Sequence, residues 1–141
     1  MHARLRPGAL VLSVLALSGC SGAPPVTRFS PCPATPNCVS STATDEKHRV
    51  EPFPFSGTAA ESLARVRAAA LALPRSRVTA EEPGYVRLTF KSAVFGFVDD
   101  LELETDEAAR VVHVRSASRV GRSDFGVNRK RVEAIRAKLG R

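Results

Sequence analysis

The stretch Val86-Arg87-Leu88-Thr89-Phe90-Lys91 alternates apolar and polar side chains, which predicts a β-strand with one buried face. The turn dipeptide Pro83-Gly84 precedes this stretch, and Val78 and Ala80 show the same alternation before the turn. Because a turn between two alternating runs favours antiparallel pairing, the segment predicts a β-hairpin.

Two further strands are predicted downstream. Their apolar positions are Phe97, Leu101 and Leu103 in the third strand and Val112 and Val114 in the fourth. A loop over residues 106–109 places aliphatic pairs on one face of this hairpin and opposite charges on the other. The predicted cross-strand pairs are Leu103–Val112, Leu101–Val114, Glu102–His113, Asp100–Arg115, Asp99–Ser116 and Phe97–Ser118.

Helices flank the four strands. Thr58 and Glu61 have the spacing of a capping box, which predicts a helix over residues 59–73 that Pro74 ends. A final helix has Val132, Ile135 and Leu139 on one face. The order of helix, four strands and helix predicts an α+β fold, a two-layer sandwich with two helices on one face of a four-stranded antiparallel sheet.

The N-terminus has the pattern of a bacterial lipoprotein signal. Arginines in residues 1–6 precede an apolar run over residues 9–17 that is too short to span a bilayer. The run closes with Leu17-Ser18-Gly19-Cys20, which predicts a signal peptide over residues 1–19 and acyl chains, palmitate among them, on Cys20. A serine rather than an aspartate follows Cys20, so we expect an outer-membrane lipoprotein facing the periplasm.

Beyond the signal peptide the chain divides into a tether and one domain. Residues 20–31 are predicted to be the lipid anchor and a proline-rich tether, and residues 32–141 a single monomeric domain that begins with an extended, loop-like arm. The whole chain carries a formal net charge of +7. If this positive charge has a partner, an exported protein would meet anionic lipid, lipopolysaccharide phosphate or an envelope protein rather than nucleic acid. The alternative is that the charge has no partner.

Cys32 and Cys38 remain once Cys20 is acylated. In an oxidising compartment this pair favours a structural disulfide, and a redox or metal role is the alternative. Neither His48 nor His113 stands at a zinc-motif spacing from the cysteines. We therefore expect no metal and no cofactor.

The segment 115–131 is richer in cations than a turn and a helix start require. Cations in the first turn of a helix are disfavoured by the helix macrodipole. This cost applies if Asn128 is the N-cap, and it is smaller if Ser123 or Asp124 is the N-cap, because the cations then fall in the second turn. Such a cluster needs an internal acidic partner or an external anion. The predicted register turns Asp99 inward, where its carboxylate needs a cation, so we expect Asp99, Asp124, Arg119, Arg122 and Arg129 to converge at one end of the sheet. The candidate polar or anion-binding residues are Asp99, Arg115, Ser116, Ser118, Arg119, Arg122, Asp124, Asn128 and Arg129.

No catalytic residues are assigned. Asp99 and Asp100 are adjacent on a predicted strand and point to opposite faces, so they cannot share a proton. Ser116 and Ser118 have no evident base to activate them. A non-enzymatic role is favoured. The alternative is an enzyme for an anionic envelope substrate, with Asp99 as base and the arginines as the clamp that holds the substrate.

Residues 32–41, 97–102 and 115–129 together resemble the domain-of-unknown-function family 1499. The resemblance implies one domain, often exported or lipidated, and brings no established activity, cofactor or catalytic residue. The expected function is that of a lipid-anchored envelope protein acting as an interaction or assembly module. A purely structural lipoprotein is a further alternative.

Overall fold

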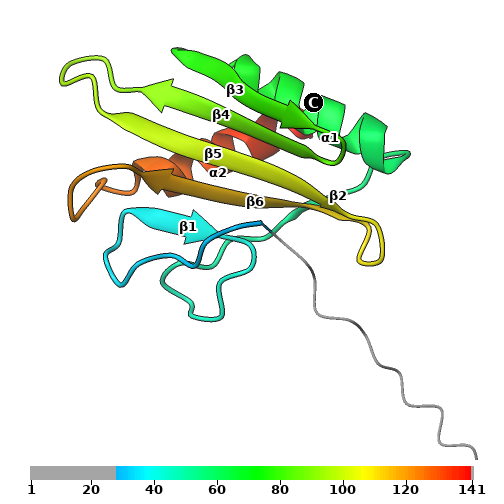
Figure 1. Ribbon diagram of the computed structural model, residues 1–141, viewed down its shortest axis with the longest axis horizontal. Coiled ribbons are helices and arrows are strands. Elements are labelled where there is room, and N and C mark those ends of the chain that lie inside the picture. The colour runs from blue at the N-terminus through cyan, green and yellow to red at the C-terminus, as the bar shows by residue number, and fades with distance from the viewer. Residues whose placement is uncertain (1–27, 141) are drawn as a thin grey trace, which may run out of the picture.

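The computed structural model describes residues 28–140, so the predicted signal peptide and Cys20 lie outside the described residues. In chain order the elements are β1 (Cys38–Ser40), β2 (Phe53–Pro54), α1 (Ala59–Leu71), β3 (Ser76–Glu82), β4 (Tyr85–Lys91), β5 (Val98–Asp106), β6 (Val111–Ser118) and α2 (Val127–Leu139) (Figure 1).

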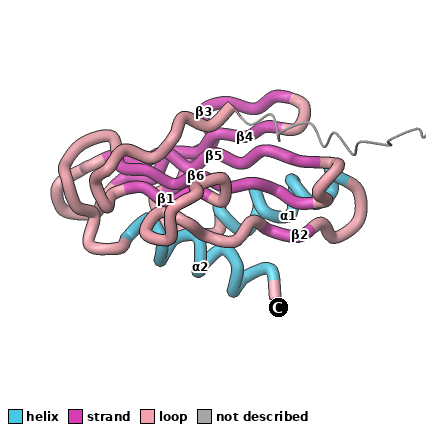
Figure 2. Tube along the Cα trace, turned by 90° about the horizontal axis from the view of Figure 1, so that it is seen from below, coloured by secondary structure: helices cyan, strands magenta, loops and turns pink. Residues whose placement is uncertain are grey.

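The described residues form one sheet of six strands in the order β1-β6-β5-β4-β3, with β2 also paired to β6. All the paired strands are antiparallel. Both helices lie on the same face of the sheet, and no helix of residues 28–140 covers the other face, which we call the open face (Figure 2). The α+β class is therefore confirmed, but the prediction of four strands is wrong.

The two missed strands come from the arm that was predicted to be loop-like. β1 and β2 have three and two residues, too few to display an alternation among the prolines. The arm also supplies core side chains, since Val39, Val50 and Phe53 are buried with the apolar faces of the sheet and helices. It is therefore an integral part of the domain.

The hairpin of β5 and β6 has a register two residues away from the predicted one. The observed pairs are Asp99–Ser118, Leu101–Ser116, Glu102–Arg115, Leu103–Val114 and Glu104–His113. Asp106 stays in β5 opposite Val111, and the turn closes with Arg110 at φ 56°. A shift of two leaves every side chain on its predicted face, which is why the alternation could not exclude it.

The predicted helices are present with small changes at their ends. Thr58 and Glu61 form the capping box of α1 as predicted, and the helix ends at Leu71, with Ala72 as its C-cap. α2 begins at Val127 after Gly126. Neither helix of residues 28–140 has the length and apolar character that crossing a membrane requires.

The predicted disulfide between Cys32 and Cys38 is present. It closes a loop in the arm directly before β1, and Cys38 is buried at the start of that strand. Asn37 lies within this loop, and its backbone carbonyl accepts the N–H of Ser118 at 3.0 Å. The covalent loop and this hydrogen bond together attach the arm to the end of β6.

Candidate functional site

Asn128, in the first turn of α2, is fully buried. Its side-chain oxygen accepts a hydrogen bond from the Ser116 hydroxyl at 2.6 Å. Its amide nitrogen donates to the Ser118 hydroxyl at 3.0 Å and to the Asn37 carbonyl at 3.2 Å. One amide thus joins α2, β6 and the arm, and satisfies polar groups that burial would otherwise leave unpaired.

Asp99 has an arginine partner, but it is Arg131 rather than any arginine predicted for it. Arg131 Nη2 lies 2.6 Å from Asp99 Oδ2, and both side chains are largely buried. Arg131 Nη1 also donates to Ser116 and Asn128, and its guanidinium lies over the Phe90 ring at 4.5 Å. All the hydrogen bonds just described stay inside the domain.

Gly126 occupies the N-cap position of α2, so neither Asn128 nor Ser123 or Asp124 is the N-cap residue that the sequence led us to expect. Asp124, two residues before Gly126, nevertheless binds the backbone of the first turn. Its carboxylate accepts the backbone N–H of Gly126 at 2.9 Å and that of Asn128 at 2.8 Å. Burial alone would raise the pKa of Asp124, but these backbone hydrogen bonds outweigh it and hold the pKa below its ordinary value. We call Asp99, Ser116, Ser118, Asp124, Asn128 and Arg131 the Asn128 cluster.

The predicted arginines do not converge on this cluster. Arg129 donates to the backbone carbonyls of Arg49 at 2.8 Å and Lys47 at 2.9 Å, and so holds the arm. Arg122 is exposed and has no ion pair within residues 28–140. The expectation that Arg119, Arg122 and Arg129 meet Asp99 is wrong, because α2 directs Arg131 toward Asp99 instead.

The two remaining arginines lie on the open face of the sheet. Arg119 makes a two-pronged ion pair with Asp100, at 2.8 and 2.9 Å, which raises the pKa of Arg119. Arg115 contacts Glu102 at 3.0 Å. The two-residue difference in register accounts for both ion pairs. Glu102 stands opposite Arg115, where Asp100 was expected, and Asp100 is left to pair with Arg119.

Glu102 is 4% exposed although it lies on the open face. Besides Arg115, it accepts the Tyr85 hydroxyl at 2.9 Å and Arg87 at 3.1 Å. Burial, followed by the hydrogen bond to Glu102, raises the pKa of Tyr85 to about 12. The carboxylate is thus matched by donors from β4 and β6, and this group acts as a cross-strand brace.

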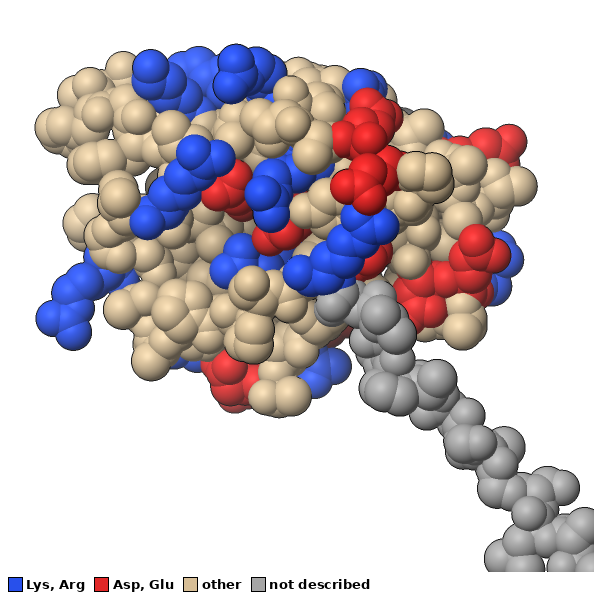
Figure 3. Space-filling model, in the orientation of Figure 1, with Lys and Arg blue, Asp and Glu red and all other residues tan. Residues whose placement is uncertain are grey.

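A basic hollow of about 540 Å³ lies on the open face, next to the ends where β3 and β5 begin and β4 ends. Its polar lining includes four cations and two hydroxyl groups: Arg75, Arg77, Lys91, Arg119, Thr79 and Thr89. In Figure 3 blue side chains prevail toward this end of the face, and most red ones lie toward the other end.

The basic hollow was only partly predicted, because Arg119 alone belonged to the candidate set. Arg75 donates to the Lys91 carbonyl at 3.0 Å, which holds the end of β4 against the turn before β3. Arg77 and Lys91 make no ion pair with any acidic side chain of residues 28–140. Hydroxyls and guanidinium groups in such a recess suit phosphate or carboxylate oxygens.

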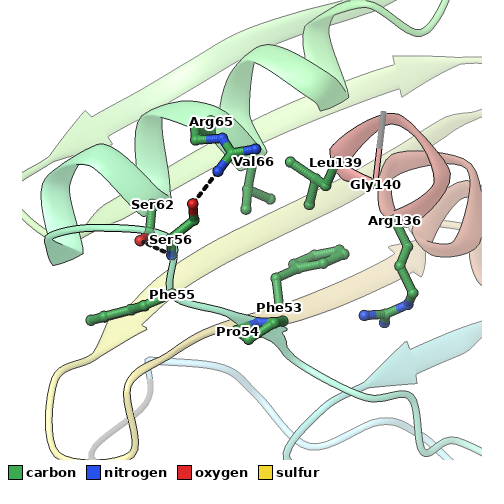
Figure 4. A pocket seen from close by; sticks show the side chains of 10 residues that line it. All are labelled: Phe53, Pro54, Phe55, Ser56, Ser62, Arg65, Val66, Arg136, Leu139 and Gly140. Atoms are coloured by element: carbon green, nitrogen blue, oxygen red, sulfur yellow. Dashed lines mark hydrogen bonds between the residues drawn. The ribbon is translucent and has the colours of Figure 1, made fainter.

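A second pocket, of about 430 Å³, lies where the arm meets both helices (Figure 4). Phe53, Val66 and Leu139 form its apolar part. Arg65 at its edge donates to Ser56, and Arg136 donates to a backbone carbonyl of the arm and lies 4.8 Å from the Phe53 ring. Its arginines therefore hold the arm against the helices. No group of three His, Cys, Asp or Glu side chains among the described residues could hold a metal ion.

Comparison with known proteins gives a family without a function. The family model described as "Protein of unknown function (DUF1499)" matches residues 28–139, which spans the arm, the sheet and both helices. No curated protein matches the chain significantly.

Proposed function

Because the chain belongs to the DUF1499 family, whose function is unknown, we propose a role from its own geometry. The protein is a lipid-anchored component of the cell envelope that acts as a non-enzymatic interaction module. It binds an anionic group, such as the phosphate of a lipid or of lipopolysaccharide, in the basic hollow. This role places the predicted anion binding at Arg119 and its neighbours on β3 and β4 rather than at Arg129.

The observation that carries this proposal is the unbalanced charge of the basic hollow. Four cations line it, and the Asp100 carboxylate is already taken by Arg119. A bound phosphate could accept hydrogen bonds from Arg77 on β3 and from Thr89 and Lys91 on β4. Gathering these cations without a ligand is unfavourable, since like charges repel, so the arrangement favours an external anion.

The position of the anchor supports the envelope setting. Cys20 precedes the first described residue, Arg28, by a short proline-containing segment. If acylated, it would hold the domain next to phosphate-bearing headgroups, where the local concentration of anions is high. The outer membrane, on its periplasmic side, remains the proposed location.

The enzyme alternative gains no support from the geometry. Its proposed base, Asp99, is engaged by Arg131 on the helix-covered face of the sheet. Arg119, one of the arginines expected to clamp the substrate, projects from the opposite face, where it pairs with Asp100. A base and a clamp on opposite sides of a sheet cannot act on one substrate.

Anion binding is tested by calorimetric titration of the mature protein with inorganic phosphate and with tripolyphosphate. Arg77→Ala combined with Lys91→Ala should weaken binding about tenfold or more, because charge-assisted hydrogen bonds are lost. Lys138→Ala removes an exposed cation on α2, far from the basic hollow, and should leave binding unchanged. Equal affinity in both variants would favour the purely structural lipoprotein.

The anchor is tested separately by membrane fractionation and intact-mass measurement. Cys20→Ala should leave the protein uncleaved or release it from the membrane fraction, since the acyl chains would be missing. Cys20→Ala protein that keeps the same mature mass and membrane association would contradict lipidation. That result would not bear on anion binding by the folded domain.

A further inference from the structure

The large apolar side chains exposed in residues 28–140 are confined to two loops. They are Val94, Phe95 and Phe97 between β4 and β5, and Val120, Phe125 and Val127 between β6 and the start of α2. Phe125 is 89% exposed and Val94 82%. Scattered apolar residues need no explanation, but concentration in two loops marks a contact surface.

The two loops lie at the same end of the molecule. β4 and β6 both run antiparallel to β5, so the end of each lies beside the start of β5. The N–H of Arg119 donates to the Val98 carbonyl at 3.1 Å, and Ala93 and Val127 line one hollow between the loops. Both loops project beyond the strands on the left of Figure 1. We call residues 92–97 and 119–127 the apolar tip.

The tip is held in a shape that keeps its side chains in solvent. Ser92 and Phe97 are joined by two hydrogen bonds, of 2.8 and 2.9 Å, and the Phe95 and Phe97 rings stack at 5.6 Å. Phe125 has φ 53°, in the left-handed region that aromatic residues rarely adopt. Within the described residues this conformation gains no buried contact for Phe125, which points to a partner outside the domain.

Cations accompany the tip. Arg122 lies in the second loop, and Lys130 lines the same hollow as Ala93 and Val127. Neither makes an ion pair with another residue of the described chain. Exposed apolar side chains with cations beside them suit a bilayer surface, where acyl chains lie beneath anionic headgroups.

We propose that the apolar tip inserts into a lipid bilayer that carries anionic headgroups, with Phe95 and Phe125 entering the acyl boundary and Arg122 and Lys130 contacting headgroup phosphates. A bilayer suits two projecting loops because it can deform around them. The inference goes beyond the proposed anion binding, since the inserting residues do not line the basic hollow. The tip is also at the end of the sheet opposite Arg28, which contacts Glu82 and Glu104, so insertion would fix the orientation of an anchored domain.

The absence of tryptophan from the chain allows a single-tryptophan test in the full mature protein. Phe95→Trp places the reporter in the tip, and Glu107→Trp places a matched control in the β5–β6 turn at the other end. Each is mixed with vesicles of phosphatidylcholine containing phosphatidylglycerol, with or without bromine on the acyl chains. Emission from Phe95→Trp should move to shorter wavelength and be quenched by brominated chains, whereas Glu107→Trp should show neither effect.

Variants of the tip make the test independent of the anchor. In the Phe95→Trp background, Phe125→Ser with Val120→Ser should reduce the quenching without lowering the melting temperature, because both side chains are exposed. Arg122→Ala with Lys130→Ala should reduce it most at low salt. An unshifted, unquenched tryptophan would overturn the inference, as would equal quenching at Glu107→Trp. If the tip inserts but the protein does not bind phosphate, only the proposed anion site is refuted. If the protein binds phosphate but Phe95→Trp shows neither a shift nor quenching, only the proposed insertion is refuted.

Discussion

The Asn128 cluster and the basic hollow are both made of charged and hydroxyl side chains near one end of the sheet, yet they differ in how their groups are matched. In the cluster, Asp99 has Arg131, and Asn128 has partners on β6 and the arm. In the basic hollow, Arg77 and Lys91 have no acidic partner within residues 28–140. Matched groups on the covered face stabilise the fold, and unmatched groups on the open face are free to bind. The predictions below test that division.

The largest effect is expected from breaking the buried ion pair. Arg131→Met should lower the free energy of unfolding by about 3–5 kcal/mol, because it leaves the Asp99 carboxylate unpaired in a largely buried place. Urea denaturation gives this value. Asp99→Asn with Arg131→Met should cost clearly less than Arg131→Met alone, and a double-mutant cycle without coupling would show that the pair does not hold the cluster.

This ion pair also shows where sequence reasoning stopped. The inward position of Asp99 and its need for an arginine were predicted, and both are correct. Which arginine pairs with Asp99 depends on the rotation and docking of α2, and both are set by long-range packing. The periodicity of Val132 and Ile135 indicates the buried face of α2 but not its axial position.

Other elements follow the same distinction between local and long-range information. The capping box of Thr58 and Glu61 and the alternation of β4 are local, and both were predicted correctly. The register of β5 and β6 was wrong by two residues because both registers keep the same faces. The basic hollow was only partly predicted, because the register shift between Val78 and Ala80, which places Arg77 opposite Thr89 on the open face, does not follow from the hairpin pattern.

A smaller, pH-dependent effect is expected at Asp124. Folding lowers its pKa, so its ionised form stabilises the domain fully well above the unfolded value of about 3.9, and this contribution is lost as the pH falls through the folded pKa. Asp124→Asn keeps a side-chain oxygen that can accept the N–H groups of Gly126 and Asn128, but it has no charge that titrates. Urea denaturation from pH 7 to pH 2 should show the gap between wild type and Asp124→Asn narrowing in acid, and a constant gap would contradict the assigned role.

The smallest effect should separate Arg122 from Arg129, two arginines that the sequence could not tell apart. Arg129→Ala removes two hydrogen bonds to the arm and should cost about 1 kcal/mol or more. Arg122→Ala should change stability by less than about 0.5 kcal/mol, because its side chain is exposed. Thermal melts of the two variants provide the comparison, and equal losses would mean that Arg122 has a structural partner.

The most direct test of the division is a titration of the isotope-labelled mature protein with inorganic phosphate, followed by its backbone amide chemical shifts. We predict that the largest shifts fall on residues 75–79 and 89–91 around the basic hollow, decline with added salt, and leave the amides of Ser116 and Asn128 unchanged. Shifts centred on Ser116 and Asn128, with none around the basic hollow, would mean that the cluster is the binding site and would contradict the account.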